Sequence, residues 1–350
     1  MADELLKVLL YFDIFSYPLT KRELIAYSGI PGGAGESADA AIKMLQREGL
    51  INRFGGLYYV GANRQNVVRR LNGNNRAVGR MKTAKRFSRL ISWFPFVRGV
   101  FISGSLSKGF AAKEDDIDYF IVTEPERLWL VRSLLTIFKK VFLFNSYRNF
   151  CINYFVDSNH LFIKEHNRYT ATEIAFLVPL FNSSMHQRLL DQNSWVKEYY
   201  PNLMENNNYD CHNNEPALKR LVEKLLSGPL TGRLDNYLHR RSRSWIRRQF
   251  SHMNDDTFAR NFRVLRHELK YLPNSQQLSI MDKYNERVNR YLKVAEGPQI
   301  GEGPQVTERQ QVAEHQRVAD PQRAEERHRA TDPQRATDPQ RATDPQRTTE

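Results

Sequence analysis

A short apolar strand, a Gly-Ser turn and two alternating aspartates lie close together in the sequence, and this combination constrains the fold most. Residues 100–103 are typical of a strand that ends at Gly104, and a second apolar strand, 119–122, directly follows Asp116 and Asp118. Residues two apart in an extended chain project to the same face, so both aspartates share one face of the second strand. Two carboxylates side by side indicate a divalent-metal site.

The same segment suits a triphosphate bound with magnesium. Magnesium takes a few carboxylates together with waters and phosphate oxygens. At Gly104-Ser105 the small side chains let backbone N–H groups approach phosphates, and Ser107 and Lys108 add a donor and a positive charge. Two metal ions about 3.5 to 4 Å apart neutralise phosphate charge and lower the pKa of an attacking hydroxyl. We therefore expect two Mg²⁺ ions and a nucleoside triphosphate here.

The motif Gly104-Ser105, ten residues, then Asp116-Ile-Asp118 resembles the signature of the DNA polymerase beta-like nucleotidyltransferase superfamily. The likeness extends over residues 95–185. It implies that Gly104 and Ser105 contact the triphosphate and that Asp116 and Asp118 are catalytic metal ligands. It also implies transfer of a nucleoside monophosphate to an acceptor hydroxyl, which could belong to a small molecule, a protein or an RNA end.

A third carboxylate usually stands on a later strand in this superfamily, and here the next strand-like segment is 150–157. Alternation places Asn153 in the middle of that strand and Asp157 at its end. Asparagine cannot accept a proton, so either Asp157 takes the catalytic role or the chain is an impaired nucleotide-sensing regulator or adaptor. Glu173 is expected to cap a helix that begins at Thr170.

Residues 1–62 have the element order of a winged helix-turn-helix domain, which they resemble. A capping box at Thr20 and Glu23 opens the second helix, residues 37–48 form the third, and Gly55-Gly56 joins a hairpin. If the domain binds DNA, helix 37–48 is expected to enter the major groove, with Lys43 and Arg47 near phosphates or bases and Arg53 on the wing. DNA binding and protein docking both remain open for this domain.

Three further segments complete the expected organisation. Residues 63–94 form a basic helical connector interrupted by Gly73 and Gly79, and residues 186–296 form a helical region with an arginine cluster at 240–248. Residues 297–350 end in a six-residue repeat that contains a proline in every unit, so we expect a disordered tail. The fold class is α+β, with a small mixed sheet flanked by helices in the nucleotidyltransferase core.

Charge and composition indicate the partners. The chain has a net charge of +13, and because its tail carries eight arginines and ten acidic residues, residues 1–296 carry +15. This excess favours polyanions such as nucleotides or nucleic acid. Two cysteines exclude a Cys-rich zinc site, and with no signal peptide or membrane span expected, we place the protein in the cytoplasm.

Overall fold

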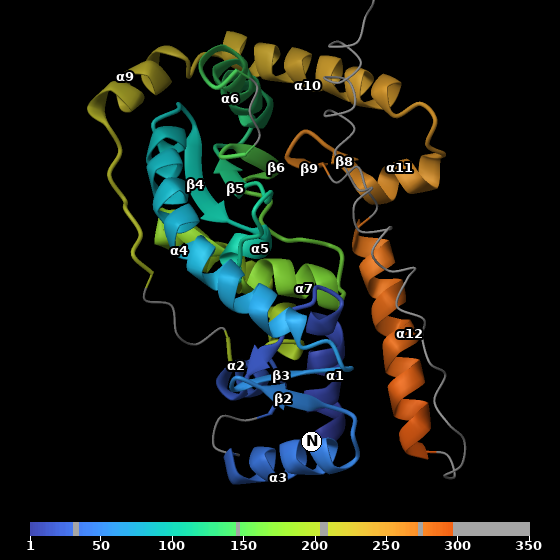
Figure 1. Ribbon diagram of the computed structural model, residues 1–350. Helices are drawn as coiled ribbons and strands as arrows, with labels where there is room; N and C mark the ends of the chain where they lie inside the picture. Colours follow the sequence, from blue (N-terminus) through green and yellow to red (C-terminus); the bar gives the residue numbers. More distant parts are fainter. Residues whose placement is uncertain (31–34, 145–147, 204–208, 272–275, 297–350) are drawn as a thin grey trace, which may run out of the picture. The chain divides into compact units, whose positions relative to one another are not determined.

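The protein is α+β, as predicted. A computed structural model describes residues 1–30, 35–144, 148–203, 209–271 and 276–296, all of which belong to one compact unit. These residues form helices and two sheets, one of three strands and one of six (Figure 1). The predicted tail, 297–350, lies outside the described residues. Among the helices of the described part, we find none with the length and apolar character that a membrane span requires.

The N-terminal part places three helices and three strands in the order α1, β1, α2, α3, β2, β3. Their bounds are α1 Ala2–Asp13, β1 Leu19–Thr20, α2 Lys21–Ala26, α3 Gly35–Arg47, β2 Asn52–Phe54 and β3 Leu57–Tyr59. Strand β3 lies between β1 and β2 in an antiparallel sheet. Gly55 and Gly56, with φ of 56° and 79°, form the two-residue turn of the hairpin. The predicted capping box at Thr20 and Glu23 is confirmed.

A single long helix, α4 (Gln65–Ser92), leads from this part to the larger sheet. The prediction that Gly73 and Gly79 interrupt the helix is wrong. A Cβ on Gly73 would lie 2.1 Å from Cε2 of Phe110, so glycine lets that ring pack directly on the helix backbone. Gly79 is exposed on the opposite side, with nothing within 4 Å of its Cβ position.

The larger sheet has the strand order β7-β4-β5-β6-β9-β8, in which β5 and β6 are parallel and all other neighbours antiparallel. Its strands are β4 Val97–Ile102, β5 Asp118–Thr123, β6 Cys151–Asp157, β7 Val178–Phe181, β8 Phe262–Val264 and β9 Glu268–Tyr271. Strands β8 and β9 come from the region predicted to be helical, so that prediction is corrected: the region 186–296 completes one edge of the sheet.

Helices cover both faces of the sheet. The helices not yet introduced are α5 Gly104–Ser107, α6 Leu128–Phe142, α7 Arg168–Ala175, α8 Ser183–Gln192, the 3-10 helix η1 Ser194–Glu198, α9 Ala217–Leu225, α10 Pro229–Gln249, α11 Asp255–Asn261 and α12 Gln276–Glu296. Val100 and Ile121 face a cluster with α4, α6 and α10, whereas Phe101 and Phe120 face a second cluster with α1, α7 and α8. Because alternate side chains of β4 and β5 enter the two clusters, both faces of these strands are buried. Only the ends of the strands can contribute to a site.

Arg168 links parts of the chain that are far apart in sequence. Its guanidinium lies 5.5 to 6.0 Å from the ring centres of Tyr11 on α1, Tyr199 and Tyr200 after η1, and Tyr284 on α12. A cation over aromatic faces is attracted by their electron density. The first and last described helices are thereby held at one cationic group.

Candidate functional site

The Gly-Ser turn and the aspartate pair meet where strands β4 and β5 lie side by side. The backbone N–H of Ser103 donates to the carbonyl of Asp118 at 3.0 Å. Gly104 follows with φ of +66°, a conformation that disfavours side chains. A Cβ on this residue would lie 2.5 Å from Oδ2 of Asp118. Glycine is therefore required for the carboxylate to approach the turn this closely.

Asp116 and Asp118 lie on either side of Ile117 where strand β5 begins. Ile117 between them is fully buried, and its backbone bonds to Arg148 and Cys151 extend the sheet by one residue. Both aspartates are half-buried. Burial, and then the charge of Asp116, raise the pKa of Asp118 to about 7. A bound cation would relieve this repulsion, and two carboxylates of this kind fit magnesium, which prefers oxygen ligands.

Asn153 takes the place beside the pair where a third carboxylate was expected. Its Nδ2 donates to Oδ1 of Asp118 at 2.8 Å, and its own Oδ1 accepts from the thiol of Cys151 at 3.3 Å. A register shift between β5 and β6 at this point gives β6 one extra residue. The amide can orient Asp118 but cannot accept a proton.

Asp157 lies at the other end of β6, so the predicted catalytic role is wrong. It pairs with Thr123, five residues along β5 from Asp118, which corresponds to roughly 16 Å of strand. Its Oδ1 accepts from the backbone N–H of Asn159 at 3.0 Å and lies 2.7 Å from Nδ1 of His160. Because β5 and β6 run parallel, Asp118 and Asp157 lie at opposite ends of the paired strands. Asp157 caps the C-terminal end of β6.

Glu173 is the residue that sequence reasoning misplaced. The predicted helix cap is instead Asn167, whose side chain accepts from the N–H of Thr170. Glu173 lies one turn further along α7 and reaches the Gly-Ser turn. Its Oε1 accepts from Lys108 Nζ at 2.9 Å and its Oε2 from the N–H of Gly104 at 3.4 Å. A carboxylate and an ammonium therefore stand next to the aspartate pair.

Both serines that were predicted to contact the triphosphate form hydrogen bonds within the protein. Ser105 Oγ donates to Oδ2 of Asp115 at 2.9 Å, and the same oxygen accepts from the N–H of Ala112 at 2.8 Å. Ser107 Oγ donates to the carbonyl of Gly104 at 2.9 Å. The sequence pattern indicated Asp116 and Asp118 but not Asp115. Asp115 stabilises the loop between the Gly-Ser turn and the aspartate pair.

Basic residues of α4 also stabilise the loop between the Gly-Ser turn and the aspartate pair. Arg76 Nε donates to the carbonyl of Ala111 at 2.9 Å, and Arg80 donates to the carbonyls of Asp115 and Arg148. Arg69 lies over the ring of Phe110 at 4.7 Å. These arginines shape the loop and add positive charge near the turn. Further along α4, Lys82, Arg86 and Arg89 are exposed to solvent.

Within the described ranges, no group of three or more His, Cys, Asp or Glu side chains is arranged to hold a metal ion by itself. A magnesium ion at Asp116 and Asp118 would need oxygens from its ligand as well. A scan of protein-family models finds none that matches the chain, and searches of curated proteins and of solved structures return no match.

Proposed function

We propose that the protein binds a magnesium–nucleoside triphosphate at this turn and transfers the nucleotidyl group to an acceptor hydroxyl. One observation carries the proposal: Gly104 adopts a positive φ, and the Asp118 carboxylate occupies the space where a Cβ would be. A turn without a side chain beside paired carboxylates is the arrangement that brings phosphates and a cation together. The sequence resemblance to polymerase beta-like nucleotidyltransferases supports the same reaction.

In this proposal Asp116 and Asp118 hold Mg²⁺, which when bound neutralises phosphate charge and lowers the pKa of the attacking hydroxyl. The N–H groups of the turn and the ammonium of Lys108 contact the phosphates, which lets Lys108 exchange its partner Glu173 for the ligand. The acceptor hydroxyl releases its proton to water, its oxygen forms a bond to the α-phosphorus, the bond from that phosphorus to the α–β bridging oxygen breaks, and pyrophosphate leaves with that oxygen. Asn153 keeps Asp118 oriented.

The first test is calorimetric titration of each nucleoside triphosphate with Mg²⁺. Asp116→Ala is expected to abolish metal-dependent binding with the fold retained. Glu114→Ala, which removes an exposed carboxylate two residues earlier, is the matched control and is expected to bind normally. Equal affinity of the Asp116 variant and the unchanged protein would defeat the assignment. Release of labelled pyrophosphate in the presence of a cell extract then tests transfer.

A second candidate is a nucleotide-sensing regulator, and the amide of Asn153 at the carboxylate position favours it. Its binding module would be residues 1–62, which we infer to be a winged helix because their element order and the strand order β1-β3-β2 agree with one. Lys43 and Arg47 on α3 and Arg53 on β2 are exposed there, and α3 also carries the acidic residues Glu36 and Asp39.

Asn153→Asp separates the two candidates. A regulator limited by the missing carboxylate gains pyrophosphate release with this substitution, whereas an active transferase already releases pyrophosphate without it. A salt-dependent shift of duplex DNA that persists in Asp118→Ala would support the regulator.

A further inference from the structure

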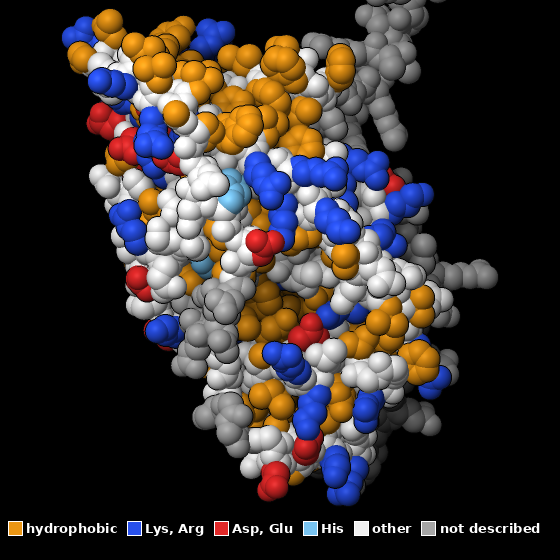
Figure 2. Space-filling view, turned by 90° about the vertical axis from the view of Figure 1, so that its left-hand side faces the viewer, with side chains coloured by type: hydrophobic (Ala, Val, Ile, Leu, Met, Phe, Trp, Pro, Cys, Tyr) orange, Lys and Arg blue, Asp and Glu red, His pale blue; other side chains and the backbone are white. Residues whose placement is uncertain are grey.

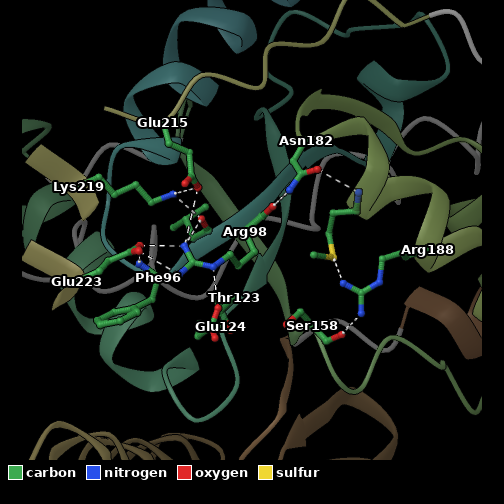
Figure 3. Close-up of polar contacts among 12 residues, drawn as sticks. Phe96, Arg98, Thr123, Glu124, Ser158, Asn182, Arg188, Glu215, Lys219 and Glu223 are labelled. Atoms are coloured by element: carbon green, nitrogen blue, oxygen red, sulfur yellow. Dashed lines mark hydrogen bonds and ion pairs between the residues drawn. The ribbon is translucent and has the colours of Figure 1, made fainter. Parts of the chain in front are cut away.

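Helix α9 turns Lys219 and Glu223 toward the larger sheet. Figure 3 shows Lys219 and Glu223 pointing from α9 toward Arg98 on β4. Arg98 binds both carboxylate oxygens of Glu223 at 2.8 and 3.0 Å, and the fully buried Lys219 Nζ donates to the carbonyl of Val97 at 2.7 Å and to Glu215 at 2.6 Å. These ion pairs fix which way the helix faces.

The outward side of α9 carries exposed leucines next to Arg220 and Lys224, and α10 continues this combination. Side chains 45 to 76% exposed line the two helices at helical spacing: Leu218, Leu221, Leu225, Leu230, Leu234 and Trp245. We call these six residues the α9–α10 face. Figure 2 shows hydrophobic side chains gathered at the end of the molecule where Figure 1 places α6, α9 and α10. A continuous exposed apolar area of this kind marks an interaction surface.

The exposed charges that α9 and α10 themselves carry have one sign. Glu223 binds Arg98, and the buried Asp235 accepts from the N–H of Leu130 at 2.8 Å, so both acidic residues of the two helices point inward. Every exposed charged side chain of α9 and α10 is basic, among them Arg220, Lys224, Arg240, Arg241 and Arg248. The two helices thus expose leucine, tryptophan and positive charge, and neither contributes an exposed carboxylate of its own.

We propose that the α9–α10 face docks on the surface of an anionic lipid bilayer. A helix lying in the membrane interface needs apolar side chains to enter the acyl boundary and Lys or Arg to meet anionic headgroups, and this face supplies both. Nucleic acid would use the charges but leave the leucines without apolar contacts, because its interfaces are polar. A second copy of the face would bring arginines against arginines. The bilayer is the partner that matches both properties.

The test is co-sedimentation of the full chain with phosphatidylcholine vesicles that do or do not contain phosphatidylglycerol. We expect binding only to the anionic vesicles, weakening with salt. Arg240→Gln with Arg241→Gln is expected to reduce the partition constant roughly 30-fold, since each basic residue near an anionic surface contributes about 1 kcal/mol. Leu221→Gln with Leu225→Gln is expected to reduce it on the order of tenfold or more.

Matched controls change the same residue types elsewhere. Lys43→Gln with Arg47→Gln removes two exposed charges from α3, and Leu71→Gln removes an exposed leucine from α4; both are expected to bind vesicles normally. Circular dichroism confirms that each variant is folded. Absence of vesicle binding overturns the proposal, as does equal binding by all variants. Duplex DNA binding, or self-association, that the α9–α10 variants abolish while vesicles are not bound overturns it too.

Discussion

Replacing Asp118 by asparagine is expected to stabilise the metal-free protein above neutral pH. In the unfolded chain this carboxyl loses its proton near its ordinary pKa of 3.8, whereas in the folded protein the pKa is about 7. Between these values the folded state binds more protons than the unfolded state, so the free energy of unfolding falls as the pH rises. Above pH 7 the protein has lost the stability that the protonated Asp118 carboxyl contributed.

The magnitude follows from the same two pKa values. One pKa unit corresponds to about 1.36 kcal/mol, so the unchanged protein loses roughly 2.5 kcal/mol between pH 5 and pH 8 through this group. Asparagine cannot ionise, and its Oδ1 can still accept the bond from Asn153. The variant therefore lacks this loss and is the more stable protein at pH 8.

Denaturant unfolding in EDTA at pH 5 and pH 8 measures the difference. Asp256→Asn, which changes an exposed carboxylate, is the control and is expected to follow the unchanged protein. Adding Mg²⁺ and ATP at pH 8 is expected to stabilise the unchanged protein and to leave Asp118→Asn unaffected. The reasoning is refuted if both proteins lose the same stability between the two pH values.

Three glycine substitutions test the packing. Gly104→Ala is expected to cost about 1–3 kcal/mol in denaturant unfolding and to abolish Mg²⁺–ATP binding in calorimetry, because the added Cβ displaces the Asp118 carboxylate; normal nucleotide binding would contradict this. Gly73→Ala is expected to cost about 1–3 kcal/mol, since its Cβ collides with Phe110. Gly79→Ala meets nothing and is expected to add about 0.5–1 kcal/mol of stability by the same measurement, so equal effects at Gly73 and Gly79 would refute the packing argument.

Local signals predicted local structure well. The Gly55-Gly56 turn and the Thr20–Glu23 capping box depend on residues no more than three apart, and both are present. The alternation that predicts Asp116 and Asp118 on one face is equally local. The approach of Asp118 to Gly104 was expected from the resemblance, not from a local rule.

Long-range contacts account for the failures. The pattern Thr170-x-x-Glu173 satisfies the capping-box rule, yet Glu173 binds Gly104 and Lys108, more than sixty residues away in the chain. Asp157 was misplaced because the sequence does not reveal that β5 and β6 run parallel. Strands β8 and β9 are three and four residues long, which is too short for a periodicity to show.

The four tyrosines around Arg168 form an aromatic cage that joins segments far apart in sequence. The domain boundaries predicted from the sequence are therefore poor sites for truncation. The walls of the cage come from the first described helix, from the middle of the chain and from α12, the last described helix. A protein truncated before residue 276 would lose Tyr284 and open the cage to water at Tyr11. The packing of helix α1 consequently depends on residues more than 270 positions later in the chain. Isolated fragments would lack these contacts of the intact protein.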